Sequence, residues 1–241
     1  KDLPGWQRTG ETDAYALYEN ENWVPMGFTY DCYVTADQLE RVSEEERAQI
    51  LCRAILLDGD QIYNGADDNA SGVSAVLQIA RAFLATGQQP ERTVVFAFWD
   101  GEEKGLLGSK AFVQSFPEIK NVKGYLNFDM IGRNNNEAKP THVVYFYTEA
   151  HPAFGDWLKN DIKKYNLNLA PDYRPWDNPV GGSDNGSFAK IGIPIIWYHT
   201  DGHPDYHQPS DHADRINWDK VVNITKASFL NMWYMANEKD F

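Results

Sequence analysis

An apolar run that ends in an acidic, glycine-bounded turn constrains the fold of this chain most. Residues 94–99 read Val-Val-Phe-Ala-Phe-Trp, and the turn Asp-Gly-Glu-Glu-Lys-Gly follows at 100–105. Apolar residues then begin again at helical spacing. The pattern predicts a buried strand, a turn and a helix, with Glu102 and Glu103 at the carboxyl edge of a sheet. Neighbouring carboxylates repel each other, and a divalent cation is their usual partner. A solvated acidic loop is the alternative.

Helical and strand patterns alternate along the chain after residue 60, without repeats, low-complexity segments or linkers. This alternation predicts an α/β fold, a three-layer sandwich with a mixed, mostly parallel sheet and helices on both faces. We expect a single domain over residues 1–241, with 1–57 as an atypical N-terminal segment and 58–241 as the core. The expected strands are 94–99, 124–131, 142–148 and 193–199, the expected helices are 43–57, 72–86, 105–115, 152–165 and 219–236, and 172–187 is expected to be a long loop.

Two of these helices rest on specific residues. Ser43 and Glu46 form the sequence signature of a capping box at the start of the first. In the helix that ends at Thr86, the apolar residues lie at the spacing of a single helix face. These residues are Val73, Val76, Leu77, Ala80, Phe83 and Leu84.

Charge and composition exclude several classes of function. The net charge of −13 argues against a nucleic-acid partner, because phosphate would be repelled. No window is apolar enough for a membrane span, and the first ten residues show no signal-peptide pattern. Cys32 and Cys52 lack metal-ligand spacing, so one disulfide or none fits the sequence.

Polar side chains recur just past the expected strand ends, where open α/β sheets bind their ligands. Carboxylates with histidine suit zinc or another first-row metal, and adjacent carboxylates suit two metals about 3.5–4 Å apart. The motifs HExxH and GxSxG and a glycine-rich phosphate loop are all missing. A calcium loop starting at Asp67 fails, because its twelfth position is Gln78. The recurring residues are Asp67, Asp68, Glu102, Glu103, Asp129, His203 and His207.

Four motifs carry a resemblance to a known family. They are GADDNASG at 65–72, FWDGEEKGLLGS at 98–109, NFDMIG at 127–132 and DYHQPSD at 205–211. In order and spacing they resemble the co-catalytic zinc aminopeptidases of the bacterial leucyl aminopeptidase type. These are clan MH exopeptidases related to glutaminyl cyclase. The match runs from about residue 59 to 241.

The resemblance implies a set of zinc ligands. Asp68 would be shared by both metals, Glu103 and His207 would complete one site, and Asp129 would serve the other. The family also has a His-x-Asp shortly before the first motif, yet this chain has no histidine before His142. We therefore expect one firm zinc and a second that is weak or absent, unless Asp58, Asp60 or another loop residue substitutes.

The resemblance also implies a mechanism of peptide hydrolysis by metal-bound hydroxide. Glu102 would be the general base, which later passes its proton to the leaving amine. Tyr206 would hydrogen-bond the developing oxyanion. The family's shared aspartate is often followed by a cis peptide bond, which here would be Asp68–Asn69.

Several other residues permit two interpretations. Asp184 and Trp176 are candidates for the substrate pocket, although a turn and simple packing explain them equally well. Asp211 either orients His207 or caps the next turn. The remaining histidines of this region, His199, His203 and His212, suit a loop or supporting position better than a ligand position.

The leading hypothesis is a zinc exopeptidase, an aminopeptidase that removes N-terminal residues from peptides. A mononuclear glutaminyl-cyclase-like acyl transferase and a binding homologue that has lost activity are the alternatives. The retained Glu102 argues against a dead site. Resemblance and acidic charge also suggest export of a bacterial protein to the periplasm, the cell surface or the medium. Residue preference and oligomeric state are not encoded in these motifs.

Overall fold

The structure is a computed structural model of residues 1–241, and it describes residues 63–176 and 181–241 together with short stretches of the N-terminal part. Those stretches are 6–11, 16–20, 33–35, 38, 40–43, 46 and 55–57. The chain divides into two compact units, residues 1–62 and residues 63–241. The division falls close to the expected change at residue 58. That both parts form one domain stays a prediction.

The first unit contains two small sheets. β1 (Trp6–Glu11) pairs antiparallel with β2 (Ala16–Asn20), and β3 (Tyr33–Thr35) pairs parallel with β4 (Ile55–Leu57).

The helix expected at 43–57 is only partly right. The capping box exists, because Ser43 donates its backbone N–H and its hydroxyl to Glu46 Oε2 at 2.9 and 2.7 Å. The end of the prediction is wrong, since residues 55–57 form a strand, and residues 47–50 and 51–54 lie outside the described residues. A short apolar run such as Ile-Leu-Leu suits either element when periodicity is the only guide.

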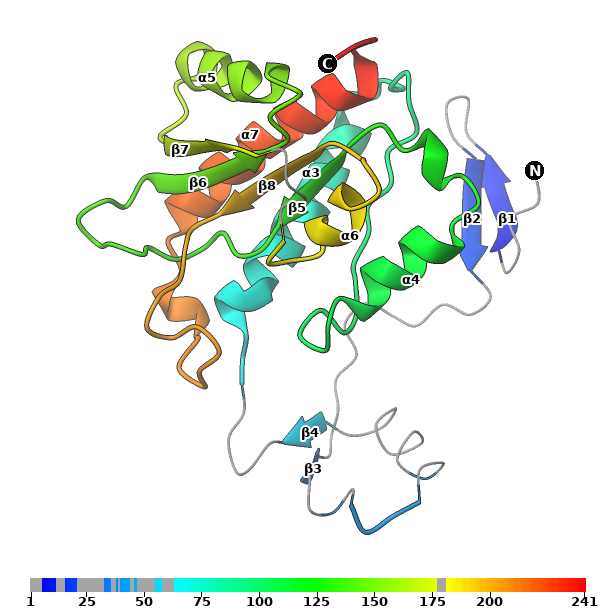
Figure 1. Cartoon of the computed structure of the whole chain (residues 1–241), viewed down its shortest axis with the longest axis vertical. Helices are drawn as coiled ribbons and strands as arrows, with labels where there is room; N and C mark the ends of the chain where they lie inside the picture. Colours follow the sequence, from blue (N-terminus) through cyan, green and yellow to red (C-terminus); the bar gives the residue numbers. More distant parts are fainter. Residues whose placement is uncertain are drawn as a thin grey trace. The chain divides into compact units, whose positions relative to one another are not determined.

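The second unit is built on a four-stranded sheet with the order β5-β8-β6-β7 (Figure 1). Its strands are β5 (Tyr125–Phe128), β6 (His142–Tyr147), β7 (Ala170–Pro175) and β8 (Ile195–His199). β5 pairs with β8 and β6 with β7 in parallel, whereas β6 and β8 are antiparallel. The sheet is therefore mixed and mostly parallel, as predicted.

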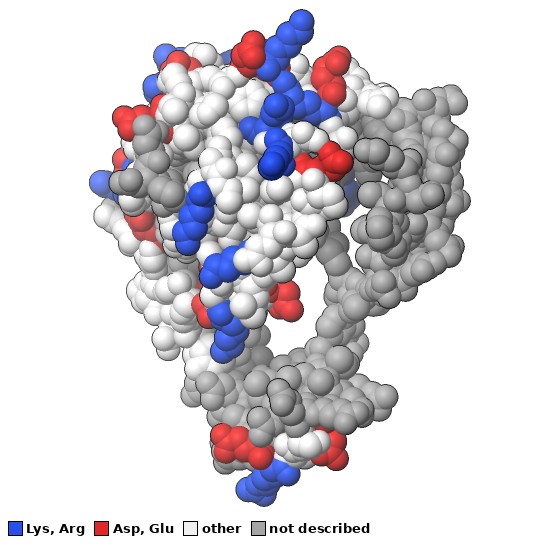
Figure 2. Space-filling view, turned by 45° about the vertical axis from the view of Figure 1, so that its right-hand side comes forward, with Lys and Arg blue, Asp and Glu red and all other residues white. Residues whose placement is uncertain are grey.

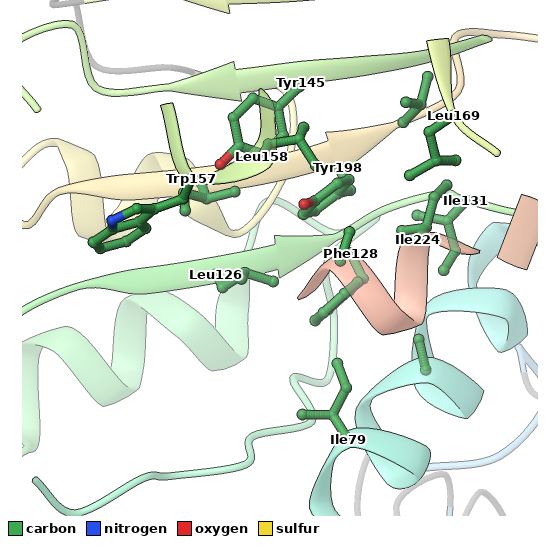
Figure 3. Packing of buried hydrophobic residues seen from close by; sticks show 14 of the residues in the cluster. Ile79, Leu126, Phe128, Ile131, Tyr145, Trp157, Leu158, Leu169, Tyr198 and Ile224 are labelled. Atoms are coloured by element: carbon green, nitrogen blue, oxygen red, sulfur yellow. The ribbon is translucent and has the colours of Figure 1, made fainter. Parts of the chain in front are cut away.

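Helices cover both faces of this sheet, so the predicted three layers are confirmed. The helices are α3 (Gly72–Thr86), α4 (Leu107–Ser115), α5 (Ala153–Tyr165), α6 (Asn185–Ala189) and α7 (Trp218–Asn237). Alternate residues of β6 and β8 enter opposite cores, as the pleat of a strand requires. Tyr145 and Tyr198 pack with α3, α5 and α7, whereas Phe146 and Trp197 pack with α4 and α6. Figure 3 shows the larger core, where Phe128 of β5 lies between Tyr198 and Ile79.

The predicted inner face of α3 is wrong in part. Val73, Leu77 and Leu84 are exposed by 42%, 41% and 68% of their surface. The helix is rotated about its axis relative to the prediction, and the glycine at its start explains this. A Cβ on Gly72 would lie 2.6 Å from the carbonyl oxygen of Phe128, so only glycine fits there. This close approach turns Gly72 towards β5 and fixes which face is inward. The buried residues are Gly72, Ala75, Ile79 and Phe83.

Residues 94–99 do not form the buried strand that the sequence predicts. The backbone from Thr93 to Trp99 makes no hydrogen bond to another described backbone segment, and Val95 is 59% exposed. The side chains nevertheless alternate, since Val94 and Phe96 pack against the larger core and Trp99 against the smaller one. The segment thus packs as a strand does, but without a ladder partner among the described residues.

β7 and α6 overlap the two ends of the stretch that the sequence predicts as a loop, 172–187. Proline at both ends of Pro171–Pro175 hid the strand, because β7 is an edge strand, where proline is tolerated. None of the helices that the structure describes is both long and apolar enough to span a membrane. On the face that Figure 2 shows, lysine and arginine are interspersed with acidic side chains, so the excess negative charge does not gather there.

Candidate metal centre

Asp68 lies in a kinked turn, η1 (Ala66–Ser71), which leads into α3. Gly65 begins the turn at φ +58°, and a Cβ there would lie 2.5 Å from the carbonyl oxygen of Asp68. Glycine is therefore required at this position. Asn69 donates to the carbonyl oxygen of Phe128 at 2.7 Å, which anchors the turn to the end of β5. The local motif GADDNASG thus sets Asp68 at the edge of the sheet.

Glu102 and Glu103 lie in the turn that precedes α4. The backbone N–H groups of Gly105 and Leu106 both donate to the carbonyl oxygen of Glu102, at 2.9 and 2.8 Å. Gly108 packs so closely on this turn that a Cβ would lie 2.8 Å from the backbone of Asp100. The glycines of the motif therefore define the turn that presents both carboxylates.

His207 lies in the loop between β8 and η3 (Ala213–Arg215), and its φ of +54° is in the left-handed region. This conformation is uncommon for a residue other than glycine, and such residues gather at functional sites. The ring of Tyr206 stacks on that of His207, with 3.8 Å between centroids. The two rings form one pair on this loop.

Three of the four predicted metal ligands come together. His207 Nε2 lies 3.0 Å from Asp68 Oδ2 and 2.8 Å from Glu103 Oε1. One ligand atom from each of the three residues lies within 4.8 Å of the other two. Among residues 63–176 and 181–241 this is the one group of three such side chains that meets so closely. Two carboxylates and an imidazole are a donor set that zinc accepts, so these residues fit the metal that the resemblance implies.

Glu102 lies beside this group and has an unusual pKa. Burial, followed by the negative charges of Glu103, Asp184 and Asp68, raises the pKa of Glu102 to about 7. Burial and the charge of Glu103 likewise raise the pKa of Asp68. A carboxyl group that titrates near neutral pH is suited to accept and return a proton.

Asp129, the fourth predicted ligand, is not a member of this group. Burial is the largest cause that raises its pKa to about 7, and the hydroxyl of Ser183, which donates to Asp129 Oδ2, works against this shift. Ser183 in turn accepts from Asn127 at 3.0 Å, and Tyr125 donates to Asn127 at 2.8 Å. Trp99 donates to Tyr125 at 3.0 Å. A chain of hydrogen bonds therefore runs from the end of the 94–99 segment to Asp129.

The peptide bonds after both aspartates, Asp68–Asn69 and Asp129–Met130, are cis. The resemblance predicted the first of these, and the second was not foreseen.

The remaining predicted residues lie around the centre. Burial and the nearby carboxylates raise the pKa of the Tyr206 hydroxyl to about 12, so it stays protonated and can donate a hydrogen bond. Asp184 is buried at the start of α6, and its Oδ1 has no hydrogen-bond partner. Trp176 is 43% exposed and packs on Phe146, which stacks on Trp197. The substrate-pocket roles of Asp184 and Trp176 stay predictions.

Two supporting carboxylates were not recognised from the sequence in their actual roles. Asp211 accepts the backbone N–H of Asp67 at 2.9 Å and that of Asp68 at 3.1 Å, so its hydrogen bonds are not those of either predicted role. Asp67 is fully buried, accepts from Gly132 at 2.5 Å and lies 3.2 Å from His203 Nε2. Neither His203 Nε2 nor Asp67 Oδ2 has a hydrogen-bond partner among the described residues. The supporting position predicted for His203 agrees with its burial.

Fold and site together define an α/β protein with a carboxylate-rich candidate metal centre at the edge of its sheet. Within that class the chain belongs to peptidase family M28, whose family model matches residues 47–232. The family is one of zinc metallopeptidases.

Known proteins show the same relationship. The chain is 37% identical to leupeptin-inactivating enzyme 1 of Streptomyces exfoliatus over 140 residues, which cover 56% of this chain and 30% of that protein. It is 32% identical to leucine aminopeptidase 1 of Trichoderma harzianum over 194 residues, 73% of this chain and 46% of that protein. The crystal structure of the Legionella pneumophila LapA aminopeptidase matches with a TM-score of 0.64 and 29% identity, over 76% of this chain and 49% of that chain. The chain therefore spans less than half the length of each of these relatives.

Proposed function

We propose that this chain carries the catalytic centre of a zinc-dependent aminopeptidase, which releases N-terminal residues from peptides. The observation that supports this most is the meeting of Asp68, Glu103 and His207 beside Glu102, whose pKa is raised to about 7. Relatives described as aminopeptidases, among them leucine aminopeptidase 1 and LapA, agree with this choice of substrate.

Asp68, Glu103 and His207 would hold the zinc ion. When bound, zinc supplies Lewis acidity, which polarises a carbonyl group and lowers the pKa of a water molecule. Glu102 accepts the proton of the attacking water and later donates it to the leaving amine, and its pKa near neutrality suits both transfers. Tyr206 keeps its proton and donates a hydrogen bond to the oxygen that becomes negative.

We also propose that one zinc ion is held firmly, on the side of Glu103 and His207. In the described part of the chain, Asp129 belongs to no group of three converging ligands. Asp58 and Asp60, the candidates to replace the missing histidine, lie outside the described residues. Structural and catalytic zinc sites have three or four protein ligands. A site with fewer ligands therefore binds zinc less tightly.

Hydrolysis of an aminoacyl anilide tests the activity. We expect the zinc-loaded protein to cleave leucine p-nitroanilide but not its N-acetyl derivative, and we expect a chelator to abolish cleavage until zinc is restored. Release of ammonia from peptides with N-terminal glutamine, without a free amino acid, would instead indicate the glutaminyl-cyclase-like reaction.

Glu102→Gln tests the mechanism. Loss of the proton acceptor should lower kcat by roughly 10²–10⁴-fold, the usual contribution of general acid–base catalysis, while the zinc content stays the same. Glu91→Gln is the matched control, because the Glu91 side chain is exposed and is not among the groups that shift the pKa of Glu102. Unchanged activity of Glu102→Gln would refute the role of this residue.

A further inference from the structure

The loop that carries His207 has no regular structure to hold it. Residues 200–212 contain neither helix nor strand. His207 itself has a φ of +54°, a conformation that its own backbone does not favour. A metal ligand on a loop of this kind is placed accurately only if surrounding side chains hold the loop.

Asp205 connects this loop to two arginine side chains. It lies two residues before His207, and its side chain is only 7% exposed. Its Oδ1 accepts from the hydroxyl of Ser210 and from Arg215 Nη1, both at 2.6 Å. Its Oδ2 lies 2.8 Å from Arg133 Nη2. Three donors from three positions in the chain therefore converge on one carboxylate.

The donors come from the elements that surround the loop. Arg133 follows β5, and its side chain is only 9% exposed, so the pair with Asp205 is withdrawn from water. Arg215 ends η3, and Ser210 belongs to the same loop as Asp205. Short, charge-assisted bonds are stronger than neutral ones, and a buried ion left without its partner is strongly destabilised. Asp205 thus ties the His207 loop to its neighbours on both sides.

Asp205 and His207 belong to the same short turn of backbone, so holding Asp205 in place also restrains His207. The N–H of Tyr206 donates to the carbonyl oxygen of His203, and that of Gln208 to the carbonyl oxygen of Asp205, both at 3.0 Å. Tyr206 and His207 therefore occupy one tight turn whose first residue is the anchored Asp205. A shift of that carboxylate has to move both rings.

We propose that Asp205, clamped by Arg133 and Arg215, is a positioning residue that sets His207 against Asp68 and Glu103. The inference rests on the metal centre proposed above. Asp205 is not one of the proposed zinc ligands, and acts only through the loop that it holds.

Asp205→Asn tests the proposal by removing the charge at nearly unchanged size. We expect its zinc Kd to rise by about 10- to 100-fold, the usual effect of losing an outer partner of a metal site. The measurement is competition against a chromophoric chelator, which needs no peptidase activity. Asp156→Asn is the matched control, because it removes one carboxylate of an exposed ion pair with Lys159 on α5. Its zinc Kd should stay at the wild-type value.

A purely structural role predicts a different result. Asp205→Asn would then have a lower melting temperature in the metal-free form, while its folded molecules bound zinc with the wild-type Kd, and this would overturn the proposal. Should Asp205→Asn fail to fold, Arg215→Met replaces it, since the Arg215 side chain is 50% exposed. A several-fold weaker zinc Kd supports the proposal, and an unchanged Kd overturns it. A wild-type protein that binds no zinc would contradict the proposed function itself, and this inference with it.

Discussion

The two sides of Asp68 differ in the properties that decide metal binding. On one side, Glu103 and His207 approach each other to 2.8 Å, although both lie on loops and their side chains are 58% and 44% exposed. On the other side, Asp129 follows the last residue of β5 and is held by a chain of hydrogen bonds, but no third ligand converges on it in the described residues. The more regular side of the site is therefore the poorer in ligands.

This difference shows that rigid support and metal affinity are separate requirements. A strand end and a polar network fix Asp129. Burial at this position also raises the pKa of its carboxyl group to about 7. A metal must displace that proton, which weakens binding. Glu103 and His207 lack a strand, yet they add two ligands beside Asp68.

Removal of one ligand from each side of Asp68 tests this asymmetry most directly. His207→Ala should weaken the first zinc by more than about 100-fold, because losing a ligand costs more than losing an outer partner. Asp129→Asn should leave the first zinc Kd close to the wild-type value. Equilibrium competition with a chelator measures both constants. An equal loss in the two variants, or two tightly held zinc ions in the wild-type protein, would contradict the asymmetry.

A smaller effect should appear in the stability of the metal-free protein. The pKa of Asp129 rises from 3.8 to about 7 on folding. The folded state therefore binds more protons than the unfolded chain between these values, and its stability falls as pH rises through them. An amide at this position cannot ionise. The unfolding free energy of Asp129→Asn should therefore exceed that of the wild type by about 2–4 kcal/mol at pH 8, and this advantage should disappear near pH 4.

Urea unfolding in the presence of a chelator, at both pH values, measures this difference. Asp156→Asn serves as the control, because the Asp156 side chain is 66% exposed. A stability gain that is the same at both pH values would show that ionisation of Asp129 is not its cause.

The sequence predicted which side chains converge better than it predicted their surroundings. Asp68, Glu103 and His207 come from three separate motifs, and each motif specifies a turn through its own glycines or local hydrogen bonds. Because each turn is built largely within its own motif, local patterns sufficed to predict these ligands. The family and the α/β fold are confirmed, and export of the protein stays a prediction.

What the sequence could not give depends on distant contacts. The inward face of α3 is set by Gly72 against the carbonyl oxygen of Phe128, and hydrophobic periodicity does not contain that contact. The strand at 94–99 was expected from composition, but a ladder needs a neighbour, which no local pattern supplies. The roles of Asp205 and Asp211 likewise become visible only when Arg133 and the η1 backbone lie beside them.

The left-handed conformation of His207 sets the proposed function against the stability of the chain. At a φ of +54° a side chain costs about 1–2 kcal/mol that glycine does not. His207→Gly should therefore make the metal-free protein more stable than His207→Ala by about 1 kcal/mol, since both lose the ring and only glycine loses the strain. Equal stabilities would show that the backbone is relaxed there. Selection for thermal stability alone would favour glycine at this position. The histidine is therefore explained by function and not by folding.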